Sequence, residues 1–136
     1  MMNKKGNTMI STSIILVVSI IFIMVLSISF IGMIKPFIMY EKLNKISQKY
    51  MFVVEKFGYL TSNEKNLLIE ELEEDGFKKE NLIINAPGNL KSYGELINFE
   101  ISYKMEYQTI KFYNGKLLLE NKDIILKSKN YSYSKI

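Results

Sequence analysis

Acidic side chains form the densest cluster of groups in this chain that could do chemistry. The members of this acidic cluster are Glu70, Glu71, Glu73, Glu74 and Asp75. Carboxylate oxygens are good ligands for divalent cations, but a run of like charges on a helix is more often a solvated face. We expect no metal site here. Glu100 and Glu106 are further carboxylates, and they fall on the polar side of an alternating segment, where we expect them to face water.

The rest of the composition leaves few routes to catalysis. The chain has no Cys, His, Trp or Arg, and all 18 basic residues are lysines. The usual zinc and copper ligands are therefore missing, and so is the side chain best suited to general base catalysis near neutral pH. No Gly-rich phosphate loop and no nucleophile motif occurs. We expect a non-enzymatic protein with no catalytic residues, no cofactor and no metal.

Aromatic and basic side chains could instead form a binding surface. The tyrosines in question are Tyr103, Tyr107, Tyr113, Tyr131 and Tyr133. Half-buried packing on strands is the commoner role for such residues, and we favour it. The net charge of +4 is dispersed along the chain, whereas phosphate recognition favours clustered Lys and Arg. We therefore expect no nucleic-acid partner.

The chain begins with a segment that could cross a membrane. Residues 9–34 hold no charged side chain, and as a helix they would extend for about 39 Å, more than a bilayer's hydrocarbon core requires. This run is too long for the apolar region of a cleaved secretory signal, and no small-x-small site follows it. We predict a short basic leader over residues 1–8 and a transmembrane helix over 9–34. The lysines near both ends leave its orientation open.

Small residues within the transmembrane helix offer two interpretations. Thr12, Ser19, Ser27 and Gly32 would allow a second helix to approach closely in lipid. Alternatively, the hydroxyl groups donate hydrogen bonds to carbonyls of their own helix and have no role in helix association. We give the two interpretations equal weight.

An amphipathic stem helix is predicted over residues 35–58. Its apolar side chains recur every three or four positions, at Met39, Leu43, Ile46, Tyr50, Val53 and Phe57. Pro36 should kink or locally break the helix, and Gly58 should end it. We favour packing of this stripe on the protein's own domain over packing on neighbouring subunits.

The remaining residues, 59–136, predict a small α+β domain. A capping box at Thr61 and Glu64 begins a helix that ends near Asp75-Gly76 and docks through Leu67, Leu68 and Leu72. Strands are expected over 81–86, 95–108, 109–113, 116–120 and 123–134, with Asn114-Gly115 as a hairpin turn. The predicted fold is therefore α+β, with a long N-terminal transmembrane-plus-amphipathic helix packed on a small antiparallel sheet.

This arrangement resembles the TadE-like and other type IV pilin-like (pseudopilin) subunits, small membrane proteins of Firmicutes. The resemblance lies in the leader ending in Lys4-Lys5-Gly6, the helix that follows it directly, the small sheet domain and the C-terminal stretch 124–133. It implies cleavage by a prepilin peptidase between Gly6 and Asn7, a cytoplasmic N-terminus and an extracytoplasmic C-terminal domain. It also implies a structural subunit of a conjugation, adhesion or secretion apparatus. The expected partners are the lipid bilayer and other pilin-like subunits.

Two positions depart from the pilin pattern. Many pilins carry Glu at the fifth mature position, which here is Ser11, and Pro36 lies further along the helix than the usual kink. A minor or initiating subunit is therefore favoured over a major one. The alternative function is an uncleaved single-pass membrane anchor with a small extracytoplasmic domain that binds a partner.

Overall fold

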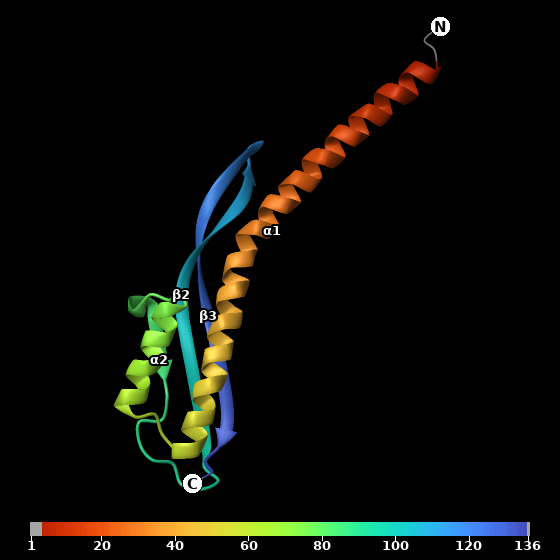
Figure 1. The fold of residues 1–136 in the computed structure, drawn as a ribbon. Helices are drawn as coiled ribbons and strands as arrows, with labels where there is room; N and C mark the ends of the chain where they lie inside the picture. The colour runs from red at the N-terminus through yellow and green to blue at the C-terminus, as the bar shows by residue number, and fades with distance from the viewer. Residues whose placement is uncertain (1–3, 136) are drawn as a thin grey trace.

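The computed structural model describes the backbone of residues 4–135 and the side chains of residues 9–135. Its elements are α1 (Lys4–Phe57), α2 (Ser62–Glu74), the 3-10 turn η1 (Lys79–Asn81), β1 (Leu82–Asn85), β2 (Leu96–Tyr113) and β3 (Lys116–Tyr133). The fold is α+β, as predicted. The C-terminal half of α1 packs along an antiparallel sheet of order β1-β2-β3, and its N-terminal half projects beyond the sheet (Figure 1).

The long helix α1 continues without a break across the predicted boundary between residues 34 and 35. Pro36 removes one backbone donor, yet its side chain is buried where α1 meets the sheet, and the helix is not interrupted there. The predicted local break is therefore absent, whereas α1 does change direction in this region (Figure 1). The helix ends as predicted, because Gly58 adopts φ 75° and its amide donates to the Val54 carbonyl at 2.7 Å.

The short helix α2 begins with the predicted capping box. The Thr61 hydroxyl accepts from the Glu64 amide at 3.2 Å, and the Glu64 carboxylate accepts from the Thr61 amide at 3.0 Å. Leu68 and Leu72 are fully buried in the core. The prediction that Leu67 also docks the helix is wrong, because its side chain points to solvent.

The sheet is dominated by one long hairpin. Asn114 and Gly115 have φ of 49° and 73°, the pair of positive values that a two-residue type I′ turn requires. The segments predicted separately on each side of this turn merge into two strands of 18 residues each, β2 and β3, in register from Tyr113↔Lys116 to Leu96↔Tyr133. The polar residues between the predicted segments do not interrupt pairing, because backbone groups alone make the ladder.

The core lies between α1, α2 and one face of β2 and β3. Leu43, Ile46 and Tyr50 are buried as predicted, but Val53 is only half-buried and Phe57 is exposed. Met51 and Val54 take their places. In this part of α1 the buried face therefore lies about one position further along the chain than the predicted stripe.

Candidate functional site

The N-terminal half of α1 presents apolar side chains on all sides. From Met9 to Ile34 nearly every side chain is exposed, and this is the one described helix long and apolar enough to cross a membrane. An exposed apolar surface of this extent has no counterpart to cover it within the described chain. It needs either lipid or other protein helices around it.

The small polar residues of this half bond mainly to α1 itself. The hydroxyls of Ser19 and Ser27 each donate to the carbonyl four residues earlier, at 2.8 Å, and Ser13 and Ser29 do the same at 3.0 and 2.9 Å. These bonds satisfy the hydroxyls without a neighbouring helix. Thr12 lies on the same exposed surface.

Gly32 contacts the protein's own hairpin. A Cβ built at this position would overlap with the backbone carbonyl oxygen of Gln108 in β2. The absence of a side chain therefore allows α1 and β2 to approach closely at this level. This contact is intramolecular, unlike the helix-to-helix contact in lipid that we considered for Gly32.

The predicted processing site lies at the start of α1. Gly6 and Asn7 fall within the helical backbone, and their side chains lie outside the described part of the chain. Ser11 follows one turn later, in the exposed apolar half. Position alone is compatible with access by a peptidase, because no described element other than α1 reaches this end of the molecule (Figure 1).

A polar seam fixes how α1 sits on the sheet, and the sequence did not predict it. We use this name for Asn44 and Ser47 of α1 together with Ser128 and Asn130 of β3. The Ser128 hydroxyl donates to Asn44 Oδ1 at 2.9 Å, and Asn130 Nδ2 donates to Ser47 Oγ at 2.7 Å. Directional bonds between buried or half-buried groups define a register that apolar packing alone would leave looser.

A salt bridge continues the seam toward the end of α1. Lys135 Nζ donates to Glu55 Oε2 at 2.6 Å, and the Glu55 carboxyl is mostly buried. The bond from Lys135, supported by Ser132, lowers the pKa of Glu55 below its ordinary value of 4.5. Glu55 therefore stays ionised at neutral pH and joins α1 to the C-terminal end of the chain.

Glu100 does not face water as predicted, and only 9% of its surface is exposed. Lys129, its cross-strand neighbour in register, donates at 3.0 Å, and Lys127 lies at 3.6 Å. Hydrogen bonding from Lys129 lowers the pKa of Glu100, and the same bond raises the pKa of Lys129. Glu100 thus has a structural role on the sheet face opposite α1. Glu106 is exposed, as predicted.

Two members of the acidic cluster form ion pairs with lysines of α1. Glu71 accepts from Lys49 Nζ at 2.8 Å, and Asp75 accepts from Lys42 Nζ at 3.2 Å. Burial of the Tyr50 hydroxyl, and next the nearby Glu71 charge, raises the pKa of Tyr50 to about 12. Among the described side chains, no three carboxylates are grouped in a way that could hold a metal ion.

The five candidate tyrosines do not form one surface. Tyr103 is buried and Tyr107 half-buried, whereas Tyr113, Tyr131 and Tyr133 are exposed, contrary to the packing role we predicted. Tyr113 lies at the tip of the hairpin and the other two exposed tyrosines at its far end. The length of the hairpin keeps them apart.

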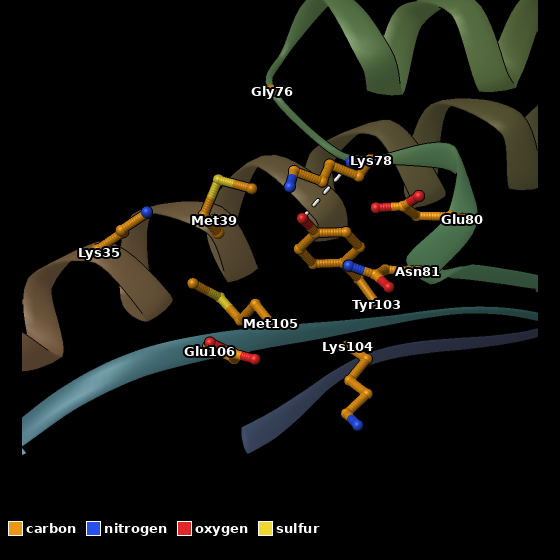
Figure 2. Close-up of a pocket in the computed structure, with 10 residues that line it drawn as sticks. All are labelled: Lys35, Met39, Gly76, Lys78, Glu80, Asn81, Tyr103, Lys104, Met105 and Glu106. Atoms are coloured by element: carbon orange, nitrogen blue, oxygen red, sulfur yellow. Dashed lines mark hydrogen bonds between the residues drawn. The ribbon is translucent and has the colours of Figure 1, made fainter. Parts of the chain in front are cut away.

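A hollow of about 630 Å³ lies where α1, η1 and β2 meet (Figure 2). Tyr103 stands in its wall, edge-on to Phe77 at 4.8 Å between ring centroids, and its hydroxyl accepts from the Lys78 amide at 3.4 Å. The charged side chains on this side of β2 include two lysines, Lys35 and Lys78, and one glutamate, Glu80. Glu106 also borders the hollow, but strand alternation places it on the opposite face of β2 from Met105. Mixed charge of this kind suits a polar segment of a partner better than a single anion or cation.

Lys104 borders the same hollow, but its side chain does not point into it. Figure 2 shows its side chain on the other side of β2 from Tyr103. Its ammonium binds Asp123 Oδ2 at 2.8 Å, which raises the pKa of Lys104. Lys104 therefore stabilises the hairpin.

Comparison with protein-family models, with curated proteins and with solved structures finds no match to this chain. A function must therefore be proposed from the geometry of the chain itself, above all from the division of α1 into an exposed half and a packed half.

Proposed function

We propose that this protein is a pseudopilin-like structural subunit of a conjugation, adhesion or secretion apparatus, anchored in the cell membrane by α1. The observation that carries the proposal is that a single helix has two environments. Its first half is apolar and exposed on all sides, and its second half supplies Leu43, Ile46, Tyr50 and Val54 to the core of the small domain. One rigid element therefore connects the bilayer to the domain.

This division suits a subunit that must exist in two surroundings. Before assembly, the exposed half of α1 would be solvated by lipid. In an assembled structure, the same side chains would pack on the helices of neighbouring subunits, because apolar contacts have no strong directional requirement. The small domain would remain outside the helical bundle in both states, held by the polar seam and the core. Ser11, in place of Glu, favours a minor or initiating subunit over a major one.

The proposal includes an orientation and a processing step. A prepilin peptidase would cleave between Gly6 and Asn7 on the cytoplasmic side, which places the C-terminal domain in the extracytoplasmic space. The intact mass and N-terminal sequence of the protein, isolated from a host that supplies the peptidase, test the step directly. We expect a chain that starts at Asn7, a full-length chain for Gly6→Ala, and normal processing for Gly88→Ala as the matched glycine control.

Orientation can be measured separately, because the chain contains no cysteine. Tyr93 is exposed in the loop before β2, so Tyr93→Cys provides a single accessible thiol. We expect a membrane-impermeant maleimide to label this variant in intact cells as fully as in permeabilised cells. Labelling only after permeabilisation would contradict the extracytoplasmic placement of the domain.

The hollow beside Tyr103 favours one alternative function. An uncleaved single-pass anchor would present its small extracytoplasmic domain to a partner, and a hollow of mixed charge offers a place to bind it. A full-length mass for both the wild-type chain and Gly6→Ala would contradict the pseudopilin proposal and support this anchor.

A further inference from the structure

The tip of the β2-β3 hairpin carries an apolar cluster that does not belong to the hydrophobic core of the domain. Register pairs Ile110 with Leu119 and Phe112 with Leu117, which places all four side chains on one face of the hairpin. We call these four residues the hairpin tip cluster. Phe112 and Leu119 are 71% and 70% exposed, and Leu117 is 54% exposed. Ile110, nearer the base of the tip, is half-buried. Adjacent exposed apolar residues of this kind often mark a contact surface.

The position of this cluster follows from the contact between Gly32 and Gln108. Gly32 belongs to the apolar half of α1, and β2 continues from Gln108 toward the tip, away from the small domain. The hairpin therefore rises beside the apolar half of α1 (Figure 1). A bilayer that surrounds α1 must come close to the tip.

The length of the apolar run places Gly32 near the surface of that bilayer. About 20 residues suffice to cross the hydrocarbon core, and residues 9–34 exceed this number. The excess brings the last turn before Lys35, including Gly32, into the boundary layer between hydrocarbon and headgroups. Everything in the hairpin beyond Gln108 then lies at this layer or deeper.

We propose that the hairpin tip cluster is a second membrane contact, which inserts obliquely into the boundary layer of the same bilayer that α1 crosses. The inference rests on the proposed function only for the membrane anchorage by α1, and it holds for either orientation of the chain. The hairpin and the apolar half of α1 diverge above their contact (Figure 1). With α1 along the bilayer normal, the hairpin is therefore inclined to the membrane.

The polar groups of the tip limit the insertion to the boundary layer. A two-stranded hairpin has open edges, whose backbone groups need water or headgroups as partners. Lys111 and Lys116 share the opposite face, and their ammonium groups can reach lipid phosphates while their stems stay among apolar groups. Tyr113, exposed beside them, has the amphipathic ring that is enriched at this depth. A depth of about 5 to 10 Å satisfies all of these groups.

The absence of tryptophan from the chain provides a direct test. Phe112→Trp places the only tryptophan in the hairpin tip cluster, and Leu119→Trp repeats the measurement from the other strand. Phe22→Trp, in the exposed apolar half of α1, is the reference for lipid contact, and Tyr131→Trp, at the far end of the same hairpin, is the reference for water. Each full-length variant is reconstituted in vesicles of phosphatidylcholine and phosphatidylglycerol, with and without chain-brominated phosphatidylcholine, and its fold is checked by circular dichroism.

We expect brominated lipid to quench Phe112→Trp and Leu119→Trp, and their emission maxima to shift to the blue of Tyr131→Trp. Aqueous acrylamide should quench them less than it quenches Tyr131→Trp. If the two tip variants behave like Tyr131→Trp while Phe22→Trp is quenched by brominated lipid, the hairpin inference is wrong and the anchorage stands. If Phe22→Trp also escapes the brominated lipid, the anchorage itself is contradicted.

A third result would assign the tip to a different occupant. Tip tryptophans with blue-shifted emission that neither brominated lipid nor acrylamide quenches would be buried against protein. That outcome would overturn lipid contact in favour of a second copy of the chain. Lipid quenching that does not change with protein density in the vesicles would exclude it.

Discussion

Glu100 on β2 and Lys129 on β3 lie directly opposite each other and join their side chains at 3.0 Å on the sheet face away from α1. The Glu100 carboxylate is largely shielded from solvent, and Lys127 places a second positive charge beside it. Opposite charges at paired positions stabilise a sheet in one register only, because a slip of one residue would place each side chain on the other face. This pair therefore helps to align the long hairpin.

Acidification should destabilise the folded protein through Glu100 and Glu55. Both carboxyls have a folded-state pKa below the ordinary 4.5, so the unfolded chain binds more protons in this range. Their contribution to stability is complete above the unfolded value and is lost as the pH falls through the folded values. In detergent micelles, we expect the melting temperature of the wild-type protein to decrease once the pH is lowered past about 4.5. Glu100→Gln should have a lower melting temperature than the wild type at pH 7 and should lose less of it on acidification. Exposed Glu106→Gln should keep the wild-type profile.

Removal of one amide from the polar seam should weaken the contact between α1 and β3. Asn130→Ala leaves the fully buried Ser47 hydroxyl without its 2.7 Å partner, and we expect a loss of about 1 to 3 kcal/mol in the free energy of unfolding. Asn98→Ala is the matched control, because Asn98 is exposed on the neighbouring strand. If chemical denaturation gave the two variants equal losses in the free energy of unfolding, the bond between Asn130 and Ser47 would contribute nothing to stability.

Two neighbouring leucines of α2 should differ sharply in their contribution to stability. Leu68 is 0% exposed and Leu67 is 49% exposed. Leu68→Ala should lower the free energy of unfolding by about 2 to 5 kcal/mol because it leaves a cavity in the core. Leu67→Ala should change it by less than about 0.5 kcal/mol. The two values, measured by denaturant titration under identical conditions, would be similar if α2 docked through both side chains.

A methyl group at position 32 should separate the hairpin from α1. Gly32→Ala would place its Cβ against the Gln108 carbonyl, which is backbone and cannot rotate away, so we expect a cost of about 1 to 3 kcal/mol. Gly88→Ala meets nothing within 4 Å and should be neutral. Thermal unfolding compares the two variants. A neutral Gly32→Ala would mean that the upper part of the hairpin moves without resistance.

Sequence periodicity predicted the elements of this fold better than their extents. The alternation in β2 and the capping box of α2 depend on neighbouring residues, and both are present in the structure. The stripe on α1 was placed less well, because Val53 and Val54 both fit a helical spacing from Tyr50, and only packing on the sheet selects Val54.

The register of the hairpin, and with it the Glu100 ion pair, could have been predicted. A two-residue turn at Asn114-Gly115 pairs Tyr113 with Lys116, and counting back along both strands pairs Glu100 with Lys129. The prediction that Glu100 faces water considered one strand alone. A buried charge on the polar face of a strand becomes apparent only when its cross-strand partner is identified.

The polar seam and the contact of Gly32 with Gln108 had no comparable signal. Each joins α1 to a strand far along the chain, and the pairing depends on how the helix lies across the sheet. The residue types of Asn44, Ser47 and Gly32 also occur at exposed positions of helices. Local pattern carries no information on which of them meets a partner, so only the assembled structure assigns their roles.

The continuity of α1 determines how the molecule would respond to force. Because one helix is both the apolar segment and a wall of the core, tension between a membrane and a partner of the small domain would run along the helix axis. The contacts of Leu43, Ser47 and Val54 with the rest of the domain would then be loaded together in shear, instead of being peeled apart one after another. The continuous helix would therefore transmit tension to the small domain without separating from it.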